Sequence, residues 1–165
     1  MNDHLSKQYD NDLEALRSQV LQMGGLVEAQ VRGAIQAFST GNLSLADQIV
    51  ETEVRVNTFE VDIDTDCSQI IVKRQPAATD LRLITVGMKI SQNLERVGDE
   101  AVTIARRARD LSTEPQLKPY VDLPRMATMS LEMLRDAITA HREASRPLSA
   151  AGACGRCFRG RSACV

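Results

Sequence analysis

The feature that most constrains the fold is an apolar repeat of seven residues that runs unbroken through residues 83–111. This spacing draws one apolar stripe along an α-helix and is typical of helices that pack with coiled-coil geometry. Two earlier segments carry a similar pattern in alternating steps of four and three. The three stripes are Tyr9, Leu13, Leu16, Val20, Met23, Val27, Gln30, Ala34 and Ala37; Leu45, Ile49, Thr52, Val56, Phe59, Ile63, Asp66 and Ile70; and Leu83, Gly87, Ile90, Leu94, Val97, Ala101, Ile104, Ala108 and Leu111.

Short connections separate these segments. In "STGN" (39–42), Gly41 suits a left-handed end of the first helix and Asn42 suits an N-cap for the second. The second segment ends in "KRQP", with bases where the helix dipole favours them, and Pro76 suits the first position of the third helix. Helices of roughly thirty residues are ~45 Å long. Short connections make neighbouring helices antiparallel, so the pattern predicts an elongated up-down-up bundle.

Composition supports packed helices. Apolar residues make up 43% of the 165 residues but aromatics only 3%, which suits helices better than a β-sandwich. The expected fold is therefore all-α. We expect residues 1–111 to form a three-helix bundle, 112–121, which contain "STEPQLKP", a linker, and 122–146 a fourth helix that no partner helix follows.

The fourth helix is expected to bury a Met-rich stripe if partner helices follow it. None follows in the sequence, so we expect this stripe to be exposed, and the chain to self-associate or hold the helix loosely. The stripe consists of Met126, Met129, Met133, Ala137 and Ala140.

Residues 147–165 are aperiodic and rich in Ala, Arg, Gly and Cys. We interpret them as disordered or as read out of frame, with the pattern lost near His141. The rival interpretation is a zinc site made by Cys154, Cys157 and Cys164, for which a fourth ligand is missing unless His141 or a second chain supplies it.

Charge and hydropathy exclude other classes. A net charge of −2 argues against a generally basic nucleic-acid binder. The polar N-terminus lacks the character of a signal peptide, and no apolar run approaches the ~20 residues that span a bilayer. We therefore expect a cytoplasmic protein. His4 and His141 are isolated and are interpreted as a tail and a surface residue, and Cys67 as a residue at the edge of the second helix.

The candidate functional residues lie on two solvent-facing stripes, one on the third helix and one on the second. Glu95 and Asp99 lie four residues apart on the third helix, a spacing at which like charges repel by a few tenths of a kcal/mol. The second helix has a mostly acidic stripe of Glu53, Asn57, Glu60, Asp64 and Cys67. Both could simply be solvated, with Arg96 and Arg106 near Asp99. Alternatively, carboxylates on adjacent helices could hold a hard cation such as Mg²⁺, Mn²⁺ or iron.

Residues 75–108, "QPAATDLRLITVGMKISQNLERVGDEAVTIARRA", resemble the signature region of the PhoU family, the regulators of bacterial phosphate uptake. The family pattern "QPxAxDLR" is matched from Gln75 to Arg82, and "LERxGDxAxxIA" from Leu94 to Ala105. "LRSQVLQMGGLVEAQVRGAIQAF" and "VETEVRVNTFEVDIDTDC" resemble the family's first two helices, so the likeness spans about residues 8–140 in one register.

The resemblance implies a fold of two repeated three-helix bundles, so that residues 122–146 are the first helix of an incomplete second bundle. It also implies that each bundle has surface carboxylates, which in some members bind iron or zinc clusters. Carried onto this sequence, the implied ligands are Glu95, Asp99, Glu53 and Asn57, where Asn57 departs from the usual acid. The oxygen-only set would equally accept Mg²⁺ or Mn²⁺.

The resemblance also implies a regulator, not an enzyme. Family members are adaptors between the ATPase subunit of the phosphate ABC transporter and the phosphate sensor histidine kinase. They repress the phosphate-starvation response, and they meet the membrane only through these partners. A homodimer is expected. The alternatives are a metal-binding bundle that mediates interaction or dimerisation without a phosphate role, a structural coiled-coil dimeriser, and a di-iron enzyme. The last usually needs inward Glu-x-x-His pairs, which the sequence lacks.

Overall fold

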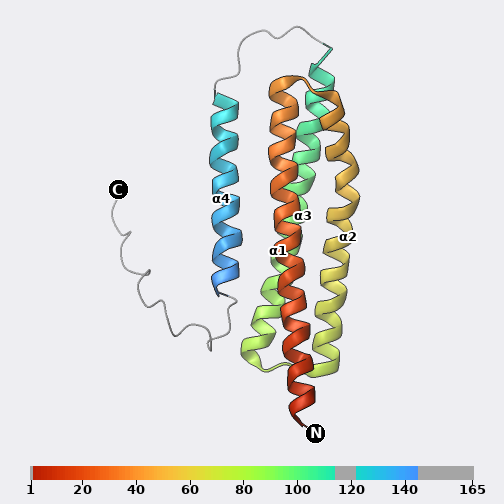
Figure 1. The fold of residues 1–165 in the computed structure, drawn as a ribbon, viewed down its shortest axis with the longest axis vertical. Coiled ribbons are helices and arrows are strands. Elements are labelled where there is room, and N and C mark those ends of the chain that lie inside the picture. The colour runs from red at the N-terminus through yellow and green to blue at the C-terminus, as the bar shows by residue number, and fades with distance from the viewer. Residues whose placement is uncertain (1, 114–121, 145–165) are drawn as a thin grey trace, which may run out of the picture.

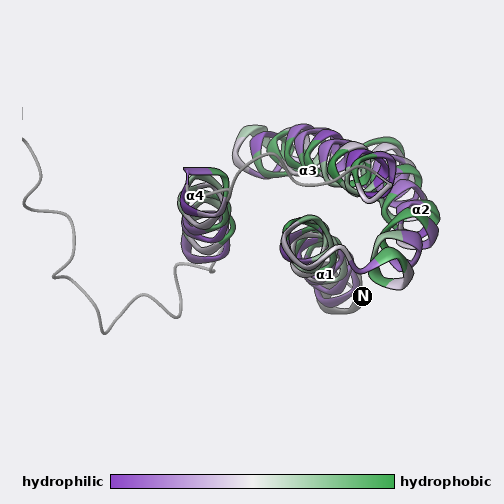
Figure 2. Cartoon of the chain, turned by 90° about the horizontal axis from the view of Figure 1, so that it is seen from above, coloured by the Kyte–Doolittle hydropathy of each residue, from purple (hydrophilic) through white to green (hydrophobic). Residues whose placement is uncertain are grey.

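The structure, a computed structural model, describes residues 2–113 and 122–144, with side chains described for 7–113 and 122–143. It contains α1 (Asn2–Thr40), α2 (Leu43–Arg74), α3 (Ala78–Leu111) and α4 (Asp122–Ala144). Helices α1 to α3 run up, down and up, and each packs against the other two (Figure 1). Seen from above, α2 and α3 form an arc around α1, and α4 lies to one side (Figure 2). The predicted all-α bundle is confirmed.

The turn between α1 and α2 forms as its residues predict. Gly41 adopts a left-handed φ of 66°, and the Asn42 side chain accepts a hydrogen bond of 3.1 Å from the Leu45 amide. The turn between α2 and α3 differs, because α3 begins at Ala78 and not at Pro76. Gln75 ends α2 in a left-handed conformation with φ 47°, and Ala77 is extended, so Pro76 lies in the turn between the two caps.

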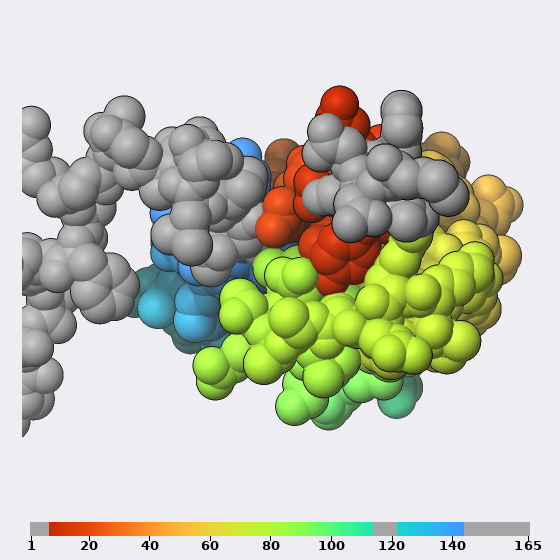
Figure 3. Space-filling model, turned by 90° about the horizontal axis from the view of Figure 1, so that it is seen from below, coloured from red at the N-terminus to blue at the C-terminus, as the bar shows by residue number. Residues whose placement is uncertain are grey.

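The stripe predicted for α1 is the centre of the bundle. Tyr9 is half buried and the other eight members are buried, because α1 lies inside the arc of its two neighbours. Tyr9 also donates a hydrogen bond of 3.0 Å to Asp80 at the start of α3, and this bond joins the lower ends of the two helices. Figure 3 shows this end, where α2 and α3 lie along two sides of α1 and α4 lies on the flank.

The predicted stripe of α3 is rotated relative to the true core face. Leu83, Ile90, Val97 and Ile104 are only half buried, and Leu111 is 45% exposed. The core face is made largely of small residues. Its members are Ile84, Gly87, Ser91, Leu94, Gly98, Ala101, Val102, Ala105 and Ala108.

The stripe of α2 was predicted only in part. Ile49, Val56, Ile63 and Ile70 are buried, whereas Leu45, Thr52, Phe59 and Asp66 are half buried. Ala46 and Cys67 complete the core instead. The placement of Cys67 at the edge of the helix is wrong, because its side chain is fully buried and its thiol donates to the Ile84 carbonyl at 3.8 Å.

At Gly98, α3 lies against side chains of both α1 and α2. A Cβ at this position would lie 3.2 Å from Gln30 Oε1 on α1 and 3.3 Å from Val56 Cγ1 on α2. Gln30 is itself 1% exposed, and its amide donates a long hydrogen bond of 3.4 Å to the Ile49 carbonyl. A Cβ at residue 98 would therefore require these side chains to shift by a few tenths of an ångström, and a larger side chain would require more room than the core offers.

Helix α4 packs on α1 with its backbone clear of α3. Ile138 occupies the space that Gly24 leaves open on α1, and Arg135 Nε donates to Glu28 at 2.7 Å. Two apolar cavities of about 200 and 360 Å³ lie between α4 and the α1–α3 pair. The predicted Met-rich stripe is not the face that packs on α1. Met126, Met129 and Met133 remain 54–66% exposed, as expected if no partner covers them.

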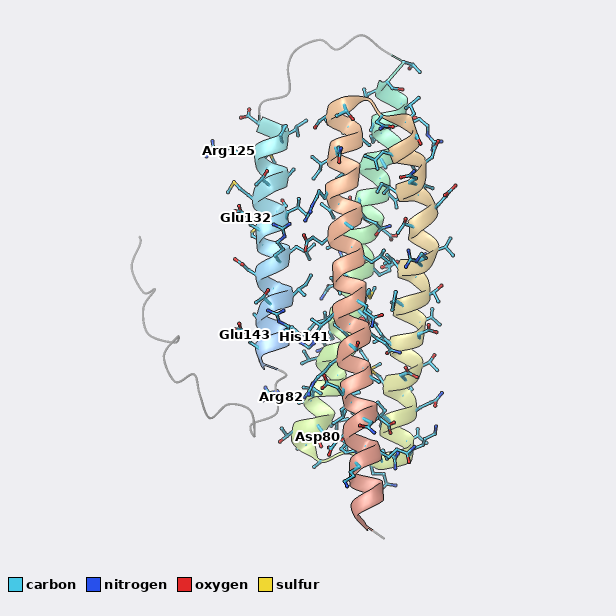
Figure 4. All side chains as sticks on the ribbon, viewed as in Figure 1. Asp80, Arg82, Arg125, Glu132, His141 and Glu143 are labelled. Atoms are coloured by element: carbon cyan, nitrogen blue, oxygen red, sulfur yellow. The ribbon has the colours of Figure 1, made fainter. Side chains whose placement is uncertain are left out.

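His141 was expected to be a surface residue, but it is half buried beside the smaller cavity. Figure 4 shows it on the side of α4 that faces the bundle. Burial, and next the positive charge of Arg17 on α1, lower the pKa of His141 below 6.5. The docked helix therefore favours the neutral imidazole.

Several predictions fall outside the described residues. These are most of the linker 112–121 and the tail 147–165 with Cys154, Cys157 and Cys164; the side chain of His4 is likewise not described. Within residues 2–113 and 122–144, no helix combines the length and apolar character that crossing a membrane requires.

The contact at Gly98 predicts a specific sensitivity to side-chain size. Gly98→Leu should lower the free energy of unfolding by about 1–3 kcal/mol, because the core must open to admit it. Gly25→Ala, where a Cβ meets nothing within 4 Å, should raise stability by up to about 1 kcal/mol through helix propensity alone. Urea unfolding followed by circular dichroism measures both. Equal effects of the two substitutions would contradict the close approach.

The environment of His141 predicts a pH dependence. Because its folded pKa lies below the unfolded value of about 6.5, the unfolded chain binds the proton more readily, and stability falls as pH drops below that value. Unfolding free energies of the wild type and His141→Gln, compared from pH 8 to pH 5, should show this loss only in the wild type. Subtracting the two curves removes the contribution of His4 and of the carboxylates. A constant difference over this range would refute the assignment.

Candidate functional site

The solvent-facing line where α2 meets α3 is a ladder of charged residues, here called the outer seam. Its first rung is Asp47 with Arg109 at 3.2 Å, and its second is Glu53 with Arg106 at 3.3 Å. Continuing in the same antiparallel register, Glu60 on α2 comes near Glu95 on α3, which also has Asp99 beside it. Two rungs therefore pair opposite charges, and the third brings acids together.

The signature residues of α3 explain how this third rung forms. Leu94 is buried, and Gly98 lies against Val56, so this turn of α3 is held tightly on α2. Glu95 and Asp99 each follow one of these core residues and sit on the flank that faces α2. The local sequence thus fixes the backbone first, and the positions of the carboxylates follow from it.

The electrostatics of Glu95 report the crowding of acids. Partial burial raises the pKa of Glu95, and repulsion from Asp99, a hydrogen bond with the Asp99 carboxyl and repulsion from Glu60 raise it further. Arg96 acts in the opposite direction and lowers that pKa, but the net shift remains upward. The third rung therefore carries negative charge that its protein neighbours compensate only in part. A cation placed there would relieve the repulsion.

The four predicted ligands divide into two groups. Glu95 and Asp99 lie together, as expected for residues one helical turn apart. Glu53 lies at the second rung, where it accepts from Arg106, and Asn57 is exposed. Glu60 belongs to the acidic stripe of α2 but not to the predicted ligand set, and it is the α2 carboxylate that acts on Glu95. Glu60 can be identified only from the register in which α2 packs on α3.

The third rung meets the requirements of a cation site only in part. Carboxylate oxygens suit hard cations. Within the described portion of the chain, however, no three His, Cys, Asp or Glu side chains converge closely enough to enclose a metal ion. The third rung offers a carboxylate pair with a third acid nearby.

Cys67 takes no part in this rung. It is 0% exposed in the core, and burial, with repulsion from Asp64 and Asp66, raises the pKa of its thiol to about 11. A protonated thiol in an apolar core is neither a metal ligand nor a nucleophile at neutral pH. The interpretation of Cys67 as part of the acidic stripe is therefore corrected.

The fold and the seam define a class of protein: an elongated three-helix bundle domain whose signature residues set helix packing and position surface carboxylates. A family model described as "PhoU domain" matches residues 20–108. The chain belongs to this family, which confirms the resemblance carried by its two signature stretches.

Individual proteins agree with this. The chain is 43% identical over 141 residues to a protein of Burkholderia sp named "Phosphate-specific transport system accessory protein PhoU homolog", a match that covers 84% of this chain and 60% of that protein. It is 40% identical over 140 residues to the Escherichia coli K12 protein named "Phosphate-specific transport system accessory protein PhoU", with 85% and 58% covered. This chain thus spans about 60% of the length of these relatives.

A solved structure supports the fold. The crystal structure of PhoU from Pseudomonas aeruginosa superposes with a TM-score of 0.80 at 40% sequence identity. The match covers 82% of this chain and 65% of that one.

Proposed function

We propose that this chain is a cytoplasmic regulator of phosphate transport that acts by binding other proteins and not by catalysis. More specifically, it is a negative regulator of phosphate uptake and of the phosphate-starvation response. It serves as an adaptor between the ATPase subunit of a phosphate ABC transporter and a sensor histidine kinase. The observation that carries this proposal is the collinear 43% identity, over 141 residues, to a phosphate-specific transport accessory protein.

The architecture is suited to such a role. Three helices of 39, 32 and 34 residues form a long bundle with extended side faces. One face carries the outer seam, and another carries apolar side chains of α3 and α4 that are at least partly exposed. Long faces of different chemical character allow two partners to bind the same molecule at once.

We further propose that the third rung of the outer seam binds a cation through Glu95 and Asp99, with Glu60 as the contribution of α2. Iron or zinc is the precedent that the family resemblance supplies, and the oxygen donors also suit Mg²⁺ or Mn²⁺. Support comes from the partly compensated charge of the rung, in contrast to the ion-paired rungs above it. Glu53 and Asn57 would then contribute from the periphery, Glu53 only after it leaves Arg106.

Metal content tests the cation proposal. Protein purified without chelator and analysed for iron, zinc, manganese and magnesium should contain bound metal that Glu95→Ala/Asp99→Ala loses. The control Glu51→Ala/Asp110→Ala removes two exposed acids elsewhere and should retain the metal. Equal metal content in the two double variants, or none in the wild type, would remove the cation site.

The proposed regulation can be tested in a bacterium from which the gene for its own relative of this chain has been deleted. In phosphate-rich medium, such a strain should express a phosphate-starvation reporter, and production of this chain should lower that expression. Gly98→Leu, which weakens the bundle, should repress less strongly at equal protein level. An unchanged reporter, with the chain accumulating in folded form, would argue against the proposed regulation.

A further inference from the structure

Helix α2 has a second seven-residue pattern on the side that faces solvent, here called the valine ridge. It follows residues 54–72 in alternating steps of four and three, and none of its members is charged. The members are Val54, Thr58, Val61, Thr65, Ser68 and Val72, and all of them are exposed. The buried Val56, Ile63 and Ile70 occupy the heptad position opposite this line, so the valine ridge points directly away from the core.

The valines of the ridge gain little from the fold. Val54, Val61 and Val72 are 69%, 59% and 77% exposed, and a β-branched side chain is a weaker helix former than leucine, lysine or glutamate. Single exposed apolar residues are common, but these three lie on one line. Thr58 adds a methyl group to that line, because its hydroxyl donates to the Val54 carbonyl of the same helix at 2.8 Å. Apolar groups at heptad spacing over ~27 Å can accept the side chains of another helix.

Acids lie on both sides of the valine ridge at its centre. Asp62 and Asp64 occupy the two heptad positions that flank it, one on each side. Asp66 and Glu60 lie one position further out on the same two sides. In the part of the chain that the structure describes, none of these four carboxylates forms a salt bridge with a lysine or arginine. The centre of the ridge therefore attracts positive charge from another molecule.

We propose that the valine ridge is a docking surface for a basic amphipathic helix of a partner protein. The apolar stripe of that helix packs along the ridge, and its lysine or arginine side chains lie against Asp62 and Asp64. Heptad spacing selects a helix as the occupant, and acids on both flanks select a basic one. The same acids disfavour a second copy of this chain, because pairing two ridges at their centres brings carboxylates against carboxylates.

The valine ridge lies on the side of the bundle away from α4. Figure 2 shows α2 at the end of the arc farthest from that helix, and within the described residues the two helices do not pack on each other. The inference rests on the proposed function only in naming the kind of partner through which a regulator acts. Binding of a helix is measured on the purified chain, so its failure is distinguishable from failure of the phosphate-starvation reporter.

Two synthetic helical peptides test the docking surface. Both have leucine at the two apolar heptad positions, and one carries lysine and the other glutamate at the flanking positions, so that like charges keep each from pairing with itself. Fluorescence anisotropy with the full chain should show a dissociation constant on the order of 100 µM or below for the lysine peptide, and binding of the glutamate peptide should be at least ~10-fold weaker.

Substitution at the centre of the valine ridge tests where the peptide binds. Val61→Gln should weaken binding of the lysine peptide by ~10-fold, because the contact would bury an amide without a partner. The matched control is Val86→Gln, which makes the same change at a valine of α3 that is 41% exposed, and it should leave binding unchanged. Circular dichroism of each variant verifies that the helices remain folded.

A charge reversal tests the flanks independently of the valines. Asp62→Lys/Asp64→Lys should reverse the preference, so that the glutamate peptide binds more tightly than the lysine peptide. The control Asp110→Lys/Asp122→Lys changes the net charge equally at exposed positions of α3 and α4, and it should keep the preference for lysine. Reversal in the first variant alone is expected only if the peptide lies between these two flanks of α2.

Four results would overturn the proposal. Three concern the peptides: neither peptide binds at up to ~1 mM, Val61→Gln and Val86→Gln weaken binding equally, or the reversal at Asp62 and Asp64 leaves the preference for lysine unchanged. The fourth is a dimer of the wild-type chain that Val61→Gln dissociates in sedimentation velocity. That result would mean that a second copy, and not a basic partner helix, occupies the valine ridge.

Discussion

The close approach of three helices at Gly98 is the constraint on which the rest of the structure depends. Because no side chain separates α3 from Gln30 and Val56 at this level, the backbones of α1, α2 and α3 are held at a fixed distance and register. That register sets which residues of α2 face which residues of α3. It pairs Asp47 with Arg109 and Glu53 with Arg106. The same register then leads to the acidic rung, so one glycine in the core positions the chemistry on the surface.

The energetic weight of these features differs. The paired rungs are largely exposed, with side-chain exposures of 50% and 57% for Arg109 and Asp47, so each contributes at most about 1 kcal/mol. The tight core around Gly98 and the buried stripe of α1 contribute far more, since burial of each large apolar side chain is worth about 1.5–3 kcal/mol. The outer seam is therefore a consequence of the packing and not its cause. The acids of the third rung can be present there because the core compensates for their repulsion.

Much of the fold follows from the sequence, because long apolar periodicity, Gly41 and Asn42 specify helices and turns locally. The face that each helix buries is harder to predict. On α3 the heptad Leu83, Ile90, Val97 and Ile104 has the pattern expected of a core face. The true core face is occupied mainly by glycine, serine and alanine. A pattern of hydrophobic residues does not single out such small side chains. On α4 the methionine stripe similarly forms a more conspicuous apolar pattern than the Leu134 and Ile138 face, which is the one that packs on the core. For a helix with two apolar faces, periodicity allows either face to be the buried one. The packing of the neighbouring helices determines which face it is.

The candidate site shows the same division between local and non-local information. Glu95 and Asp99 are predictable because they lie on one helix, at a spacing that the signature motif fixes. Their counterpart Glu60 is not, because Glu53, Asn57, Glu60 and Asp64 all lie on one stripe and differ only in height along α2. Choosing among them requires the register, and the register depends on the contact of Gly98 with Val56. Recognition of a motif can thus identify the half of a two-helix site that lies within the motif, while the other half is determined by packing.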